Sequence, residues 1–360
     1  MFIKKLTLNN FKNFSQQEFE FKNINCIAGN NGVGKTTVLD AIHYLSFCRS
    51  FLSFSDSDTV KYGEDFFSLC GTYVFDDGSE QCFVISQKKG ERKKIKNGKQ
   101  LYKKFSQHIG KLPCVVVSPN DHNLITGRSE VRRKFVDIIL SQTDITYMDC
   151  LIKYNKCLEQ RNKLLKLFQQ TSSPDFVQLE IWDSQLAANA HIIRSKRQEF
   201  FDEFAVPFTR YYNFITQSNA EEIPCVQYST FEGDLTSILK ENAAKESILG
   251  YTTAGIHRDD LKFMLNSHPV SSTASQGQQK TFLLALKLAQ FDFIKTKTKT
   301  VPILLLDDIF DKFDFSRVSK ILQLVAQDNF KQVFITDTQQ DRLEKIIPEN
   351  KKESSVLIKL

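Results

Sequence analysis

Apolar residues recur along the chain at two spacings, which separate stretches typical of strands from stretches typical of helices. Residues 24–28 form a short apolar run typical of a buried strand. After a glycine-rich loop, residues 35–47 place Val38, Leu39 and Ile42 at helical spacing. The pattern therefore predicts the order strand, glycine loop, helix near the start of the chain.

Other strand signals are short and bounded by turn residues. Residues 66–75 and 81–86 are typical of two strands joined by a turn at 76–79, and 113–117 is typical of a buried strand. Further strands are predicted at residues 223–229, 261–265, 301–306 and 333–336.

A long helical region is predicted from residue 129 to about 207, with a break near 143–144 and a turn at 171–174. We expect two antiparallel helices there, forming an arm on the order of 40 Å long at 1.5 Å per residue. Too few heptads are sustained for a long coiled coil. Shorter helices are predicted at residues 234–249 and from 275 to about 295.

The glycine loop fits the phosphate-binding pattern G-x-x-x-x-G-K-[ST]. Its glycines would let backbone N–H groups converge on phosphates, and the helix start adds partial positive charge. Lys35 would reach the β- and γ-phosphates, and the Thr36 hydroxyl would ligate Mg²⁺. A glycine turn before an ordinary helix is the weaker alternative, so we expect a nucleoside triphosphate site. The predicted binding residues are Gly29, Asn30, Asn31, Gly32, Val33, Gly34, Lys35, Thr36 and Thr37.

Two acidic residues, Asp307 and Asp308, follow the apolar run at 301–306. Such a run is typical of a strand buried on both faces in a parallel sheet, and open α/β sheets bind ligands at the carboxyl ends of their strands. We expect Asp307 to hold Mg²⁺ with Thr36, and Asp308 to orient or deprotonate an attacking water. Lys35 and Asp308 are the predicted catalytic residues. A strand ending in a polar turn is the alternative that the glycine loop disfavours.

A serine and a glycine open the helix that begins at Ser275-Gln276-Gly277. Free N–H groups at a helix start form an anion site. One chain needs a single phosphate-binding loop, so this second site would serve the nucleotide of another copy. A simple helix cap is the alternative, and these residues alone would favour it.

Composition narrows the class of protein. The 360 residues are 41% hydrophobic and 25% charged, which is ordinary for a globular protein. The net charge of +6 is a mild bias that suggests a polyanionic partner but is a weak signal alone. The eight cysteines are scattered, without C-x-x-C pairs, so a metal site or disulfide framework is not expected. The sequence shows no signal peptide and no apolar run of membrane-spanning length, so we expect a cytoplasmic protein with no membrane partner.

Basic residues gather in 88–104, around the turn signal Asn97-Gly98. Such a ribbon could lie along a phosphate backbone, although lysine-rich edge strands also protect sheets from aggregation. For the basic residues of the arm, a solvated helix face is the stronger alternative. The predicted DNA-contacting residues are Lys88, Lys89, Arg92, Lys93, Lys94 and Lys96.

Together these motifs resemble those of ATP-binding-cassette ATPases of the structural-maintenance-of-chromosomes (SMC) group, and most closely those of the RecF family of bacterial recombination mediators. Residues 10–14, the glycine loop, 275–279 and 304–308 stand in the family's order, across essentially the whole chain. Residues 119–133 resemble the pattern P-[ED]-x-x-x-L-x-x-G-x-P-x-x-R-R, and 256–261 resemble G-P-H-[RK]-x-D-L.

Several positions depart from the family pattern. Asn120 replaces an acid, and Ser129 and Ile256 stand where proline is usual. Residues 311–314 (Asp-Lys-Phe-Asp) differ from the usual S-E-L-D, which puts the dimer contact of that loop in doubt. Asp337 lies where many cassette ATPases have a histidine near the γ-phosphate, so fast turnover is not expected.

The resemblance implies an α/β fold of two lobes. A nucleotide-binding lobe with a mixed sheet would combine residues 1–118 and 300–360. A mainly helical lobe, residues 119–299, would carry the short antiparallel helical arm and the segment that begins at Ser275.

The resemblance also implies ATP and Mg²⁺ as cofactors and an ATP-dependent homodimer, in which Ser275, Gln276 and Gly277 contact the nucleotide in trans. Such a dimer would clamp DNA at single-stranded gaps, single-strand/double-strand junctions or stalled forks. It would help to load recombinase and support replication restart and SOS induction, with RecR and RecO as partners. Hydrolysis would be weak, DNA-stimulated and used as a switch.

Three rival functions remain open from the sequence. A cassette ATPase of a transporter would couple to membrane helices, which the arm and the basic ribbon do not favour. A P-loop kinase for a small molecule would need no second copy. A nucleotide-gated scaffold would recruit proteins without binding DNA.

Overall fold

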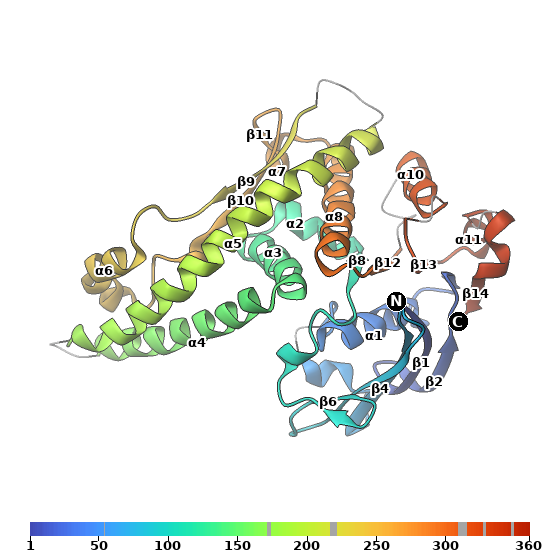
Figure 1. Cartoon of the computed structure of the whole chain (residues 1–360), viewed down its shortest axis with the longest axis horizontal. Coiled ribbons are helices and arrows are strands. Elements are labelled where there is room, and N and C mark those ends of the chain that lie inside the picture. The colour runs from blue at the N-terminus through green and yellow to red at the C-terminus, as the bar shows by residue number, and fades with distance from the viewer. Residues whose placement is uncertain (54, 171–173, 217–221, 309–314, 327–328, 347–348) are drawn as a thin grey trace. The chain divides into compact units, whose positions relative to one another are not determined.

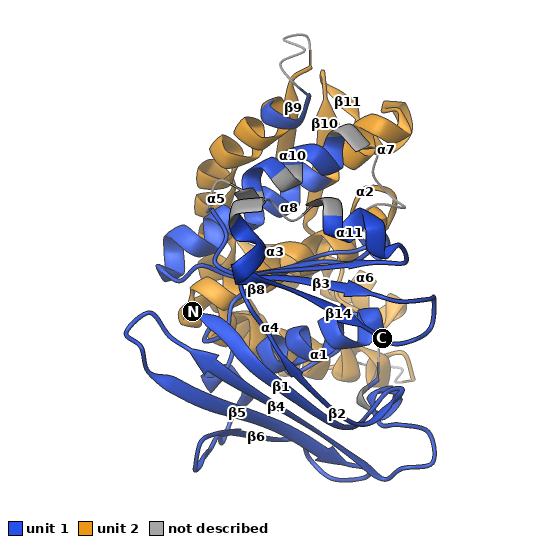
Figure 2. Ribbon diagram, turned by 90° about the vertical axis from the view of Figure 1, so that its right-hand side faces the viewer, with its two compact units in different colours: residues 1–121, 214–217, 284–360 blue, residues 122–213, 218–283 orange. Residues whose placement is uncertain are grey.

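The computed structural model describes residues 1–360 except 54, 171–173, 217–221, 309–314, 327–328 and 347–348. The chain forms two compact units (Figure 2). Unit 1 comprises residues 1–121, 214–217 and 284–360, and unit 2 comprises 122–213 and 218–283. The α/β class expected from the sequence is confirmed. The sequence placed the lobe limits at 118 and 300, whereas the units meet at 121 and at 284, inside a helix.

The first sheet of unit 1 is antiparallel, with the strand order β2-β1-β4-β5-β6-β7, of which Figure 2 labels β2 to β6. Alternate residues are buried, as expected for a sheet with one covered face; on β1, Leu6 and Leu8 have no exposed surface. The turn predicted at Asn97-Gly98 joins β6 to β7. The strands are β1 (Phe2–Phe11), β2 (Phe14–Glu20), β4 (Phe66–Val74), β5 (Glu80–Lys88), β6 (Lys94–Asn97) and β7 (Gln100–Leu101).

The second sheet of unit 1 is parallel, with the order β14-β3-β13-β12-β8. Every described residue of β3, β12 and β13 is buried, as the continuous apolar runs predict. Helix α1 (Lys35–Phe47) packs against strands of both sheets. The strands are β3 (Ile24–Ala28), β8 (Cys114–Val117), β12 (Ile303–Leu306), β13 (Val333–Asp337) and β14 (Ser355–Lys359).

In the described part of the chain, helices from its last third also contribute to unit 1. They are α8 (Gln276–Thr298), α10 (Phe315–Ala326) and α11 (Gln340–Ile346). The Asp-Lys-Phe-Asp segment at 311–314 lies outside the described residues. None of the helices in the described part of the chain is long and apolar enough to cross a membrane.

Unit 2 is built around the helical arm, with α4 (Ile145–Phe168) beside α5 (Val177–Thr216) (Figure 1). The predicted break before α4 is an N-cap, where the Asp144 carboxylate accepts a hydrogen bond from the Tyr147 N–H at 3.0 Å. The expected end near Pro207 is wrong, because α5 continues to Thr216. Phe208, Tyr211, Tyr212 and Ile215 extend its buried apolar stripe, which outweighs the hydrogen bond that proline removes.

The rest of unit 2 is a small sheet with short helices. Its strands are antiparallel in the order β11-β10-β9. The strands are β9 (Pro224–Ser229), β10 (Asp260–Leu265) and β11 (His268–Pro269). The helices are α2 (Asn123–Thr126), α3 (Ser129–Thr143), α6 (Leu235–Leu249) and α7 (Val270–Thr273).

Candidate nucleotide-binding site

The glycine loop turns directly from β3 into α1. Gly34 adopts φ +116°, and a Cβ there would lie 2.6 Å from the Asn13 amide nitrogen and 2.7 Å from the Phe14 ring, so only glycine fits. None of the described side chains caps α1 at this end. Its first N–H groups are therefore available to an anion.

The strand turn at residues 10–14 braces the loop and its helix. The Asn13 amide donates a hydrogen bond to the Val33 carbonyl at 3.0 Å. Lys12 pairs at 2.5 Å with Asp40, a carboxylate of α1 that has no exposed surface. This part of the family resemblance therefore has a structural basis beside the loop.

The Lys35 ammonium group lies inside the curve of the loop. It donates to the Gly29 carbonyl at 2.7 Å and to the Asn30 carbonyl at 3.0 Å, and the residue is only 7% exposed. A buried cation held by neutral carbonyls is a strong electrostatic attractor for phosphate oxygens.

Asp307, immediately after β12, lies against the start of α1. Its Oδ1 accepts hydrogen bonds from the Thr36 hydroxyl at 3.0 Å and the Thr336 hydroxyl at 2.9 Å. Burial raises the pKa of the Asp307 carboxyl, the two hydroxyls oppose that rise, and Asp308 adds to it. Thr36 and Asp307, predicted separately as metal ligands, thus lie within hydrogen-bonding distance of each other.

Thr336 was not identified from the sequence. Its hydroxyl donates to Asp307 and also accepts a hydrogen bond from the Asp308 backbone N–H at 2.9 Å. Asp308 has φ +49°, a left-handed conformation that is costly for a residue with a side chain. Thr336 therefore fixes both carboxylate-bearing residues at the end of β12.

These groups line one polar cleft of about 170 Å³. It draws on the loop, on α1 and on the ends of β12 and β13, so segments about 300 residues apart in sequence form one site. Its lining residues are Asn31, Gly32, Gly34, Lys35, Thr36, Thr37, Asp307, Asp308 and Thr336.

The segment at Ser275 belongs to unit 2 and forms a capping box. The Ser275 hydroxyl accepts from the Gln278 N–H at 3.2 Å, and the Gln278 side chain accepts from the Ser275 N–H at 2.8 Å. Ser275 and Gln276 are exposed, and Gly277 is half-buried. The cap alternative is therefore present, on a surface that a second molecule could reach.

The predicted DNA-contacting residues do not behave alike. Lys94 and Lys96 are exposed on β6, on either side of buried Ile95. Lys93 instead lies 4.7 Å above the Tyr44 ring and donates to a main-chain carbonyl, so it is the member least available to phosphate. Lys88, Lys89 and Arg92 are exposed around the turn between β5 and β6.

The parts of the two family-like segments that lie in unit 2 bind each other. Arg132 pairs with Asp260, and Arg133 donates to the Asp259 carbonyl at 2.6 Å. Arg197, on α5, reaches the Asp259 carboxylate at 2.7 Å. Residues 119–133 and 256–261 are thus two halves of one polar network.

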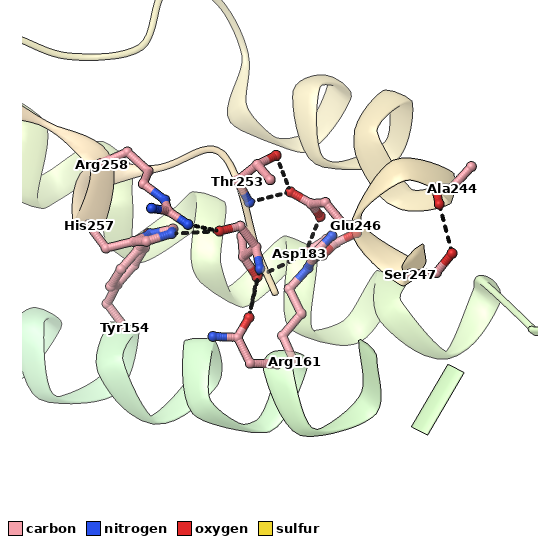
Figure 3. Close-up of polar contacts among 11 residues, drawn as sticks. Tyr154, Arg161, Asp183, Ala244, Glu246, Ser247, Thr253, His257 and Arg258 are labelled. Carbon is pink, nitrogen blue, oxygen red and sulfur yellow. Dashed lines mark hydrogen bonds and ion pairs between the residues drawn. The ribbon is translucent and has the colours of Figure 1, made fainter. Parts of the chain in front are cut away.

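A second polar network ties α4 and α5 to α6 (Figure 3). Arg161 has no exposed surface, and its guanidinium contacts Asp183 and Glu246, each at 2.5 Å. The Glu246 carboxylate also accepts from the Thr253 N–H and hydroxyl. His257 is bonded between the Tyr154 hydroxyl at 2.7 Å and the Thr252 carbonyl at 3.1 Å. These contacts hold the loop before β10 against the arm.

Known proteins resemble this chain over nearly its whole length. The model of the RecF/RecN/SMC N-terminal domain matches residues 2–355. A protein of Flavobacterium johnsoniae called DNA replication and repair protein RecF is 45% identical over 348 residues, which cover 96% of this chain and 97% of that protein. A protein of the same name from Bacteroides thetaiotaomicron is 42% identical and covers 96% and 94%.

Solved structures give the same picture. The structure described as the recombination mediator protein RecF with ATP in the RecFOR pathway superposes with a TM-score of 0.87 at 30% identity, covering 94% of this chain and 92% of that one. An SMC head domain from Pyrococcus furiosus superposes with a TM-score of 0.55 at 16% identity, which shows similarity of fold alone.

Proposed function

Because this chain belongs to the RecF family of DNA replication and repair proteins, ATPases of the SMC type, we propose that it is an ATP-dependent, DNA-binding recombination mediator. The observation that carries the proposal is the approach of Thr36 to Asp307, 3.0 Å between oxygens, beside a glycine loop that holds Lys35. Each of these groups has a role in binding or hydrolysing the triphosphate.

The residues present fit a magnesium ion. Thr36 and Asp307 supply a hydroxyl and a carboxylate oxygen, which are the hard ligands that Mg²⁺ prefers. A cation nearby would also stabilise the charged form of the buried Asp307 carboxylate. When bound, Mg²⁺ would neutralise charge on the β- and γ-phosphates. The N–H groups of the loop and of α1 would bind the remaining phosphate oxygens, and Lys35 would move from its carbonyl partners to the triphosphate.

Asp308 is the candidate for positioning the attacking water. It lines the same cleft as Lys35, and its backbone is held in place by Thr336. Its carboxylate would accept a proton from the water as the oxygen of that water bonds to the γ-phosphorus, while the bond from the γ-phosphorus to the bridging oxygen breaks and ADP leaves. With Asp337 in the place where many cassette ATPases have histidine, we expect slow hydrolysis that acts as a switch.

We propose that ATP joins two copies of the chain. Ser275, Gln276 and Gly277 of one copy would contact the γ-phosphate held by the loop of the other. This requires Ser275 to exchange part of its capping box for the ligand, which is a modest cost at an exposed helix start. Hydrolysis removes the charge that these contacts need, so the dimer would open.

The proposed ligand of the dimer is DNA at gaps, junctions and stalled forks. The exposed lysines of β6 support a phosphate-backbone contact. The solved relatives are described as recombination mediators of the RecFOR pathway, which makes RecR and RecO the candidate protein partners, with recombinase loading, replication restart and SOS induction as downstream effects. No observation favours a transporter ATPase or a metabolite kinase.

The proposal is tested by equilibrium binding of labelled DNA to the purified chain, with and without Mg²⁺-ATP. We expect gapped duplex to bind more tightly than intact duplex, with ATP strengthening the preference. The Lys35→Met variant should lose the effect of ATP and retain its fold. Equal binding of both DNAs, unaffected by ATP, would contradict the proposal.

A further inference from the structure

A polar cleft of about 400 Å³ lies in unit 2 beside the β9–β10 pair, far in sequence from the glycine loop. Its volume is within the range of sites that hold a small molecule or one unit of a polymer. Its lining residues come from α5 and from β9 and β10 with the loop after β9, and these strands run alongside α5 in Figure 1. Its lining residues are Arg194, Gln227, Tyr228, Ser229, Thr230, Phe231, Glu232 and Lys262.

Two residues that line the cleft are held in place by a buried carboxylate. The hydroxyls of Tyr228 and Thr230 both donate to the carboxylate of Asp259, which is almost fully buried and pairs with Arg197. The Tyr228 ring also stacks on Phe201 of α5, with 5.0 Å between centroids. These contacts fix the end of β9, so the groups above it have a defined arrangement.

Cationic and polar residues are among those that line the cleft. Lys262 pairs in register with Gln227 across the two strands, and both are exposed. Within the described part of the chain, the side chains of Lys262 and Arg194 have no acidic partner and no hydrogen bond. Glu232 is the acid among the lining residues, so two cations and one carboxylate leave an excess of one positive charge. The cleft therefore favours an anion.

An aromatic platform stands next to these cations. The Arg194 guanidinium lies over the Phe231 ring, 5.0 Å from its centroid. Stacked guanidinium and aromatic planes are surfaces on which unpaired nucleic-acid bases stack, while neighbouring cations bind the phosphate. An acidic peptide would bind the cations but would not need the stacked Arg194 and Phe231 side chains.

We propose that this cleft binds one nucleotide of single-stranded DNA, with its phosphate at Arg194 and Lys262 and its base on the Arg194–Phe231 stack. The inference rests on the proposed DNA-binding function and adds to it a contact in unit 2. It also gives a reason for a preference for gaps, because only an unpaired base can reach the platform.

The test uses fluorescence anisotropy of the full chain with a labelled oligothymidylate of about 20 nucleotides, over a range of salt concentrations. In the variant Arg194→Gln/Lys262→Gln, we expect affinity to fall at least about fivefold. We also expect the salt dependence to become shallower, by about 0.7 in slope for each phosphate that the variant no longer binds. The matched control is Lys240→Gln/Lys245→Gln, which removes two exposed charges from α6 and should bind like the wild type.

Three further arms of the experiment separate the possible outcomes. Phe231→Leu should weaken binding of oligothymidylate and leave an abasic oligonucleotide of equal length unaffected. Lys262→Gln alone guards against a folding defect, because its side chain is exposed. If wild-type protein binds DNA while Arg194→Gln/Lys262→Gln and Phe231→Leu both match the control in affinity and salt slope, this inference is wrong and the proposed function stands. If a poly-glutamate peptide displaces the DNA at equal charge concentration, the cleft is a peptide site and the inference also fails. Absence of wild-type DNA binding would instead contradict the proposed function and the inference together.

Discussion

Arg132 holds Asp260 through a two-point contact, Nε to Oδ1 at 3.0 Å and Nη2 to Oδ2 at 3.1 Å. The same guanidinium donates to the Gly127 carbonyl at 2.7 Å. One side chain thus joins the loop before α3 to the first residue of β10, more than 120 residues further along the chain. Two segments that the family resemblance treats as separate motifs are therefore held together by one arginine.

Replacing Arg132 tests how much its contact with Asp260 stabilises the fold. Arg132→Lys keeps the charge and removes the fork that contacts both carboxylate oxygens, so we expect a loss of about 1–3 kcal/mol in the free energy of unfolding. Chemical denaturation measures it, with Arg128→Lys as the control at an exposed neighbour. Equal stability of the two variants would show that the contact contributes nothing.

His257 predicts how stability depends on pH. Burial lowers the pKa of its imidazole to about 4, from an ordinary 6.5, and the ring accepts from Tyr154 at the nitrogen that would be protonated. Between pH 4 and pH 6.5 the unfolded chain binds more protons at His257 than the folded chain does. The contribution of neutral His257 to the free energy of unfolding is therefore fully present above about pH 6.5 and declines as the pH falls toward 4. His257→Gln should be less stable at pH 7 but show a shallower decline in urea midpoint. A decline as steep as in the wild type would exclude this role for His257.

Thr336 should act on the proposed metal site through its hydrogen bonds with Asp307 and Asp308. Thr336→Val removes the hydroxyl that fixes Asp307 and Asp308, while Thr336→Ser keeps it. We expect the valine variant to need roughly tenfold more Mg²⁺ for half-maximal binding of a fluorescent ATP analogue, the lower end of the range for residues that orient metal ligands. The serine variant should restore the wild-type requirement. A normal Mg²⁺ requirement for the valine variant would show that the Thr336 hydroxyl is not needed for metal binding.

Asp308→Asn separates hydrolysis from binding. The amide keeps the size of the side chain and cannot accept a proton, so phosphate release should fall about 10²-fold or more while ATP still binds. The ATP-bound dimer should accordingly persist. Malachite-green phosphate release and gel filtration measure the two effects. Normal hydrolysis by the variant would show that another group positions the water.

The sequence predicted those parts of the site that depend on local order. Strand, glycine loop and helix follow one another directly, and Asp307 ends an apolar run, so both could be recognised without the fold. Thr336 could not, because its contact with Asp307 arises from the parallel pairing of β12 with β13, in which Leu306 lies opposite Ile335. Only the fold shows which strand ends are neighbours.

The sequence also could not predict which side chains are buried by elements far away along the chain. Lys93 looks like its neighbours in a lysine-rich stretch, yet its ammonium group turns inward onto Tyr44. The end of α5 was misplaced because proline is a strong local signal, whereas the packing of Phe208 and Tyr212 depends on tertiary structure. In both cases burial by distant elements overrides the local pattern.

The central claim is that the triphosphate held by one copy is also bound by Ser275 of another. Sedimentation velocity of the purified chain in saturating Mg²⁺-ATP, with DNA present, tests it most directly. We predict a shift from monomer to dimer for the wild type, and a monomer for Ser275→Arg, which should still bind ATP. A wild-type chain that stays monomeric under these conditions, or a Ser275→Arg variant that dimerises normally, would contradict the claim.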